Sequence, residues 1–360
     1  MDQRDVLELK TRLKKDRCSF QRIRSVYVNS DKQKVTSSNS QFLALEDDEA
    51  FKYLEIAKKT LSGKIDDALL NVDIDTKEQE QKDLIQLLNA LKASELKDDA
   101  LTDQLFDRII DTYNSVEPFY IVLYYDAYDV PVKTSDNNKL DESELVYEYL
   151  LCSICPVKMS KPGLGYLEDK NVIGSRNRDW VVQAPDIGFL YPAFNERCAD
   201  VDAALFFSKN TKEPNHQFME QMFGSMMVET KTEKKEKFAA ILNSSVKTEA
   251  NAESITYSFH EKLNELAEER ADNEQENKPL TADDVKEVAK EAGMDENQAS
   301  IVAATYKTAF KDHEPSPDVL VDDKLLGKQL IKENTELKAR IVDLMKENEN
   351  LRQKLKVNSL

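Results

Sequence analysis

The spacing of apolar residues predicts that the first 113 residues combine helices with strands. Apolar side chains recur every three or four positions in four segments, which is typical of amphipathic helices. Residues 23–28 and 35–45 are instead rich in β-branched side chains on either side of a polar turn, which predicts a pair of strands. The expected helices cover residues 3–15, 46–61, 80–93 and 102–113.

From Pro118 onward the pattern changes to short runs of aromatic and β-branched residues, which favour strands. Four of the eight glycines and five of the ten prolines lie in residues 131–192, so many loops are expected between these strands. We therefore expect a mainly antiparallel sheet. Its strands are predicted at residues 119–125, 147–157, 179–182, 189–194 and 203–207.

The last part of the chain returns to helical spacing. Residues 267–279 are acidic and rich in amides without an apolar period, which is typical of a linker or a helix end. Pro315 and Pro317 mark a second break. Helices are expected over residues 217–227, 232–242, 282–292 and 296–310.

These patterns predict an α+β fold class. An N-terminal mixed domain with a mainly antiparallel sheet and flanking helices is followed by a helical appendage and a C-terminal coiled coil. The expected boundaries are 1–228 for the α+β domain, 229–270 for a helical extension, 271–280 for an acidic linker, 281–312 for a two-helix unit, 313–322 for a proline-containing linker and 323–356 for the coiled coil.

A heptad repeat near the C-terminus predicts how the chain assembles. Leucines recur every seven residues and would line one seam of a helix; they are Leu330, Leu337, Leu344 and Leu351. If these are d positions, the a positions are Asn334, Ile341, Asn348 and Leu355.

Asparagine at an a position lowers stability but favours a parallel, two-stranded pairing in register, because the two amides can bond each other. Glu333 would attract Lys338 of the other strand, and Glu347 would attract Arg352. The expected partner is therefore a second copy of the chain, in a parallel homodimer. A single helix packed on its own domain, or a free amphipathic tail, is the alternative.

Composition predicts a soluble cytoplasmic protein. Hydrophobic residues make up 40% and charged residues 33% of the chain, and the mean hydropathy is -0.60. No apolar stretch reaches the ~18 residues of a membrane span, and the first residues lack the apolar core of a secretory signal. The four cysteines are too sparse for a disulfide scaffold. Cys152 and Cys155 lie three apart in a predicted strand, on opposite faces, so we expect buried structural thiols and no zinc site.

The net charge is -18, yet residues 1–34 carry ten Lys and Arg against five Asp and Glu. Such a basic end is a candidate surface for nucleic acid or an acidic partner; it includes Lys10, Lys14, Arg17, Arg22 and Arg24. Arg176 and Arg178 adjoin the sole tryptophan, Trp180, and are a second candidate for stacking on bases or a peptide. The alternatives are that the basic end offsets an acidic body, and that the tryptophan is a core residue.

Little in the sequence indicates catalysis. The segment Pro162-Gly-Leu-Gly165 lacks the third glycine of a dinucleotide fingerprint and the Gly-Lys of a phosphate loop, so it is read as a turn. The three histidines are far apart in sequence, which argues against histidine-based chemistry, and no cofactor is predicted. A metal-dependent hydrolase or nuclease is the rival hypothesis. It would use Arg176 or Arg178 with loop carboxylates from Asp126, Asp129, Asp136 and Asp141.

Seven segments of the chain carry a resemblance to a known family, namely Asp5–Leu9, Tyr53–Gly63, Lys133–Glu144, Leu151–Val157, Ser160–Tyr166, Asp179–Val182 and Pro192–Phe194. Together they resemble an uncharacterised domain-of-unknown-function family of Gram-positive bacteria. The resemblance covers roughly residues 1–225 and implies a bacterial cytoplasmic protein with a single N-terminal unit. It implies no activity, so no catalytic residue is carried over.

The leading hypothesis is accordingly a non-enzymatic dimeric interaction or scaffold protein. It rests on the heptad repeat, the basic ends and the absence of a catalytic motif. Dimerisation would bring two copies of the basic segment onto one particle and raise its avidity for an acidic partner such as nucleic acid.

Overall fold

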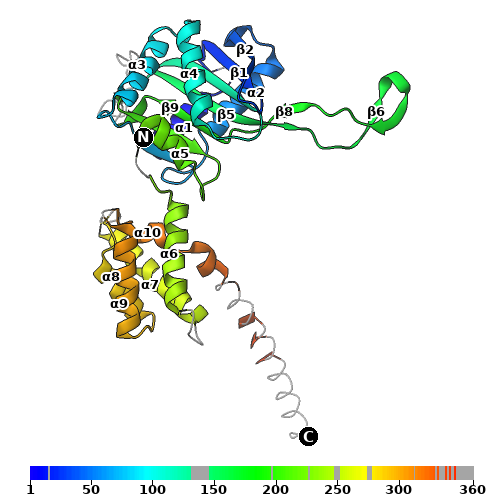
Figure 1. Ribbon diagram of the computed structural model, residues 1–360. Helices are drawn as coiled ribbons and strands as arrows, with labels where there is room; N and C mark the ends of the chain where they lie inside the picture. Colours follow the sequence, from blue (N-terminus) through cyan, green and yellow to red (C-terminus); the bar gives the residue numbers. More distant parts are fainter. Residues whose placement is uncertain are drawn as a thin grey trace, which may run out of the picture. The chain divides into compact units, whose positions relative to one another are not determined.

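The computed structural model describes residues 1–14, 17–130, 146–195, 198–225, 228–246, 252–273, 278–311 and 313–328, with residues 331, 337–338, 340–341 and 344–345 beyond them. It divides into two compact units, Met1–Thr230 and Lys231–Leu360 (Figure 1). The first unit contains the strands and the second is helical, so the predicted α+β class is confirmed.

An antiparallel sheet organises the first unit. Its strands follow the order β2-β1-β4-β5-β9-β12-β3, and each neighbouring pair is antiparallel. The predicted mainly antiparallel sheet is thus confirmed, although residues 69–73 were not expected to be a strand. The bounds are β1 Arg22–Val28, β2 Lys34–Gln41, β3 Leu69–Asp73, β4 Phe119–Asp129, β5 Val146–Met159, β9 Ile187–Tyr191 and β12 Ala203–Ser208.

Helices cover both faces of this sheet. Helices α3 (Gln79–Ala93), α4 (Asp99–Thr112) and α5 (His216–Phe223) share one hydrophobic cluster with it. Helices α1 (Gln3–Arg12) and α2 (Asp47–Thr60) share a second cluster. Successive strand residues point to opposite faces, so each central strand contributes to both clusters.

Short elements complete the first unit. A 3-10 turn, η1 (Phe42–Ala44), ends the run after β2, which is why the strand is shorter than the predicted 35–45. Strands β10 (Ala193–Asn195) and β11 (Cys198–Asp200) form a separate two-stranded ribbon.

The segment of residues 157–182, called the arm below, extends away from the sheet (Figure 1). The end of β5 pairs with β8 (Trp180–Val182) and forms the base of the arm. Strands β6 (Leu164–Leu167) and β7 (Val172–Ser175) pair with each other at its far end, joined by the 3-10 turn η2 (Glu168–Lys170). The segment read from sequence as a turn at residues 162–165 therefore leads into a strand.

The second unit is built from helices around one core. The helical extension and the two-helix unit, which were separate segments in the sequence-based prediction, both contribute to this cluster. The predicted helices 282–292 and 296–310 are confirmed. The bounds are α6 Lys231–Val246, α7 Ala252–Asp272, α8 Ala282–Glu291, α9 Glu296–Phe310 and α10 Pro317–Leu320. None of the helices among the described residues is long and apolar enough to cross a membrane.

Candidate interaction surface

The base of the arm carries exposed apolar residues. Met159 and Trp180 are register partners across β5 and β8, so their side chains lie on the same face of the ribbon. Both are exposed, and the interpretation of Trp180 as a core residue is therefore wrong. Arg178 links the two strands of this ribbon, because its Nε donates a hydrogen bond to the carbonyl oxygen of Ser160 at 2.8 Å.

The far end of the arm has one bare apolar face. Tyr166 and Ile173 are register partners, and Leu164 lies on the same face two positions before Tyr166. Their side chains are 58%, 68% and 78% exposed respectively. Monomeric proteins rarely expose contiguous large apolar residues, so this face is a candidate contact surface.

The opposite face of the β6–β7 hairpin is covered in part by the hairpin's own side chains, although Val172 on that face is 49% exposed. The Leu167 side chain lies over Gly174, and the Arg176 side chain lies over Gly165. Arg176 Nη2 also donates to the carbonyl oxygen of Lys161 at 3.3 Å. Both arginines singled out from sequence thus have structural roles in the arm, and they leave the apolar face uncovered.

The arm differs in charge from the rest of the chain. Residues 157–182 hold five Lys and Arg against three Asp and Glu, within a protein of net charge -18. Two of the three acids, Glu168 and Asp169, lie in the turn η2 at the far end. A partner is therefore expected to meet mixed charge and apolar surface there.

The predicted N-terminal basic surface is changed by the position of Arg24. Lys14 and Arg17 are exposed, and Lys10 and Arg22 are half-buried. Arg24 is buried, and its Nη2 lies 2.5 Å from Asp99 Oδ1. Strand alternation places it on the sheet face that packs against α4, so it does not belong to an exposed basic surface.

The carboxylates of the predicted metal site are placed only in part. Asp126 is buried and accepts a hydrogen bond from the Tyr149 hydroxyl at 2.7 Å. Burial and this carboxylate raise the pKa of Tyr149 well above its usual range. The Asp129 side chain, Asp136 and Asp141 lie outside the described residues. Among the residues described, no group of three or more His, Cys, Asp or Glu is placed to hold a metal ion.

Cys152 and Cys155 are buried, as predicted. Burial raises the pKa of Cys155 to about 12 and that of Cys152 well above its usual value. Neither thiol is therefore expected to ionise near neutral pH.

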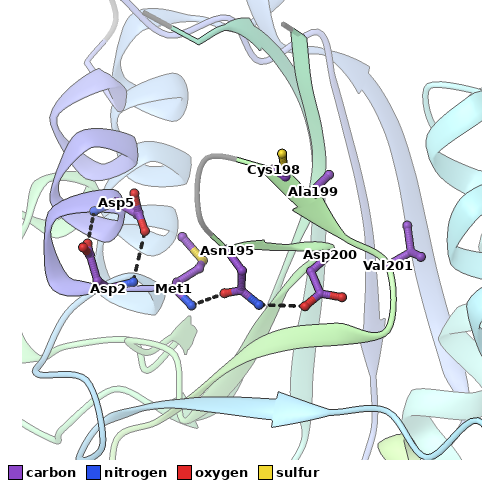
Figure 2. Close-up of a pocket in the computed structure, with 8 residues that line it drawn as sticks. All are labelled: Met1, Asp2, Asp5, Asn195, Cys198, Ala199, Asp200 and Val201. Carbon is purple, nitrogen blue, oxygen red and sulfur yellow. Dashed lines mark hydrogen bonds between the residues drawn. The ribbon is translucent and has the colours of Figure 1, made fainter. Parts of the chain in front are cut away.

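A hollow of about 900 Å³ lies beside α1 and is lined in part by the carboxylates of Asp2, Asp5 and Asp200 (Figure 2). The Met1 amine donates to Asn71 Oδ1 at 2.8 Å and also to Asn195 Oδ1. Asn195 Nδ2 in turn donates to Asp200 Oδ2 at 2.8 Å, as drawn in Figure 2. Asp2 and Asp5 cap the first turn of α1 through each other's backbone amides. Asn71 and Asn195 thus join the N-terminus to β3 and β10.

Most of the heptad positions lie outside the described residues, namely Leu330, Asn334, Asn348, Leu351 and Leu355. Three described positions, Leu337, Ile341 and Leu344, are helical and are 61%, 51% and 49% exposed. The seam is therefore uncovered at these positions within a single chain.

Comparison with known proteins gives one finding about ancestry. No curated protein matches the chain, and no solved structure matches it either. A family model described as Domain of unknown function (DUF4317) matches residues 1–349, which includes the segments of the sequence resemblance and extends well beyond residue 225. The chain therefore belongs to this uncharacterised family.

Proposed function

We propose that this protein is a non-enzymatic, dimeric interaction protein, in which two copies pair through their C-terminal heptad helices. The observation that carries the proposal is the exposure of Leu337, Ile341 and Leu344, each of which is helical in the described residues. Each such side chain gains about 1.5–3 kcal/mol when it is fully buried. A second copy buries the same seam on both chains at once.

The charged residues that flank the heptad seam support a second copy of the chain as its binding partner. The g and e positions of a parallel pair would bring Glu333 to Lys338 and Glu347 to Arg352, both of opposite sign. The asparagines at a positions favour two strands in register. A partner helix from another protein would need to match the seam and these charges independently.

Sedimentation equilibrium of the full-length protein tests this proposal. The wild type is expected to be a dimer at micromolar concentration, and the double variant Leu337→Glu with Leu344→Glu a monomer. The matched control, Thr335→Glu with Val342→Glu, adds the same charge at b positions outside the seam and should stay dimeric. A monomeric wild type, or a mass unchanged by the seam variant and by deletion of residues 323–360, would reject it.

The arm is the proposed contact surface for a further partner. Its bare face of Leu164, Tyr166 and Ile173 is apolar, and dimerisation would present two such faces on one particle. We favour a protein partner, because Glu168 and Asp169 at the turn would repel phosphates.

Nucleic acid remains a separate prediction from the basic residues. Fluorescence anisotropy with labelled duplex and single strands at low salt tests it, and binding should weaken steeply as salt is added. The variant Arg176→Ala with Arg178→Ala should reduce any such binding. The absence of an anisotropy change at low salt would reject nucleic-acid association and leave the dimer proposal standing.

A further inference from the structure

Strand β2 forms an open edge of the main sheet. It pairs with β1 on one side and ends the strand order on the other. Every second residue of an antiparallel edge strand directs its N–H and C=O groups away from the sheet. Within the described part of the chain, no backbone group from another segment hydrogen bonds to residues 34–41 outside the β1 pairing. Edge strands of this length are templates for strand addition.

Two hollows follow each other along this edge. The first, about 530 Å³, lies between β2 and the start of α4 and is lined by the register partners Arg24 and Asn39. The second, about 320 Å³, is lined by the next pair on the same face, Arg22 and Gln41. Residues two apart on a strand are about 6.5–7 Å apart. The residue pairs that line the two hollows are thus spaced like alternate side chains of an extended peptide.

The first hollow contains a guanidinium group with unused donors. Arg24 is 7% exposed, and its Nε and Nη1 are buried without an acceptor among the described residues. Buried donors that lack acceptors are destabilising, and this is most severe for charged groups. Among the described residues, the carboxylate paired with Arg24 is that of Asp99, whose side chain is 83% exposed.

The other acids near this hollow are already paired. Asp103 and Asp107 both lie within 2.8 Å of the Lys34 ammonium group. Asp99 is therefore the carboxylate that an incoming acid would have to displace. Nε–H and Nη1–H lie on different edges of the guanidinium plane, so an incoming carboxylate would accept from one of these two donors, or would take the Nη2 donor that Asp99 now occupies.

We propose that the edge of β2 binds an extended peptide segment by strand addition, with a Glu or Asp side chain of that segment placed against Arg24. The peptide backbone hydrogen bonds to the outward N–H and C=O groups of β2, and its carboxylate accepts a hydrogen bond from the buried guanidinium of Arg24. The next alternate side chain enters the hollow beside Arg22. The acids along the groove, Asp99 and Glu95, disfavour a polyanion such as nucleic acid. This site is independent of the heptad helix and of the arm.

Two matched heptapeptide pools test the proposal on the full-length protein. Both carry Thr, Val, Ile and Tyr at variable positions, with Glu fixed at the centre of one and Gln at the centre of the other. Fluorescence anisotropy should show about tenfold tighter binding of the Glu pool. A selected Glu peptide is then N-methylated at one backbone amide at a time. Methylation at every second position should abolish binding, and methylation at the positions between should not, because only alternate amides face β2. Hydrogen exchange should slow in residues 34–41.

Substitutions in the protein test whether the preference for the Glu peptide over the Gln peptide arises from the groove beside β2. Asp99→Asn removes the competing carboxylate from an exposed position, so it should tighten the Glu peptide by about threefold. Asp111→Asn, also exposed on α4, is the matched control and should change nothing. Arg24→Met should abolish the preference for Glu over Gln.

Three results would overturn the proposal. These are equal binding of the two pools, no binding of either at millimolar peptide, and an effect of N-methylation that is the same at every position. Because Arg24 is buried, Arg24→Met can destabilise the fold. The exposed Asp99→Asn variant therefore tests the proposal independently of Arg24→Met.

Discussion

The Thr60 methyl group on α2 lies directly over the backbone of Gly188 on β9. A Cβ atom added to Gly188 would come within 2.5 Å of Thr60 Cγ2 and closer still to the carbonyl oxygen of Cys152. The Thr60 hydroxyl shares a buried hydrogen bond of 2.7 Å with the Ser153 hydroxyl on β5. The helix thus approaches the sheet closely where β9 has no side chain.

Gly188→Ala is expected to destabilise the first unit by about 1–3 kcal/mol, because the added methyl group must displace α2 or the neighbouring strand. Urea unfolding of the full chain measures the change. Gly163→Ala is the control, since a Cβ atom there meets no neighbour within 4 Å. Equal stability of the two variants would show that α2 can shift without cost.

Thiol labelling should distinguish the four cysteines. Cys198 is exposed, whereas Cys152 and Cys155 are buried, and burial raises the pKa of the half-buried Cys18 to about 12. A brief treatment with maleimide at pH 7 should therefore add one group, located at Cys198 by peptide mass spectrometry. Rapid labelling of Cys152 in the native chain would contradict the buried position described for β5.

Acid should destabilise the second unit through His260. Its Nδ1 accepts a hydrogen bond from the Asp322 amide at 3.3 Å, and burial lowers its pKa below the usual 6.5. The unfolded chain then binds a proton at higher pH than the folded chain does. The contribution of the neutral His260 ring to the free energy of unfolding is therefore fully present above about pH 6.5 and decreases as the pH falls further.

Calorimetry of the full chain at pH 7.5 and pH 5 tests this dependence. His260→Asn keeps an acceptor oxygen near the Asp322 amide but does not titrate, so the acid-dependent loss should become smaller. If wild type and variant lose the same stability, other groups control the acid response of the second unit.

Arg270 joins the end of α7 to the start of α8. Its Nη1 donates to the carbonyl oxygens of Lys278 and Pro279 at 2.9 and 3.1 Å, and its Nη2 donates to Asp284 at 2.8 Å. Arg270→Met removes this donor from both carbonyl oxygens and leaves Asp284 with the Thr281 amide, so it should cost about 2–4 kcal/mol in thermal or urea unfolding. Lys262→Met, on the exposed side of the same helix, should have no measurable effect.

The two asparagines of the heptad repeat provide a test of specificity. Asn334→Leu with Asn348→Leu should raise the thermal stability of the dimer and broaden the assembly to include higher oligomers, because the amide pairing that selects two strands is lost. Sedimentation velocity measures the distribution. A variant that stays strictly dimeric would show that the flanking charges alone set the number of strands.

Strong periodicity explains what the sequence could predict. The helices found at Gln79–Ala93 and Asp99–Thr112 begin within three residues of the predictions, and the apolar run 147–157 is confirmed as part of β5. These elements bury a regular stripe or both faces, and such patterns are visible locally. By contrast, β3 is short and contains Asn71, whose amide serves the Met1 backbone, so its strand character depends on distant β12.

The candidate sites were harder to predict, because charge alone does not reveal burial. Arg22 and Arg24 are equivalent in sequence, yet the start of α4 buries Arg24 under Asp99 and leaves Arg22 beside Asn39. In the arm, Gly165 and Gly174 indicated turns, but Arg176 and Leu167 cover them within paired strands. The first outcome depends on Asp99, which lies far along the chain, and the second depends on the pairing of β6 with β7, which a count of glycines does not reveal.

The sheet of the first unit acts as a partition between two apolar compartments. Leu151 and Cys152 are consecutive, yet they belong to different clusters on opposite sides. Among the described residues, the buried apolar side chains of α2 and of α3 therefore belong to different clusters. Substitutions in one compartment can accumulate and repack without altering the other, so the two halves of this interior are free to diverge at separate rates while the strand order is retained.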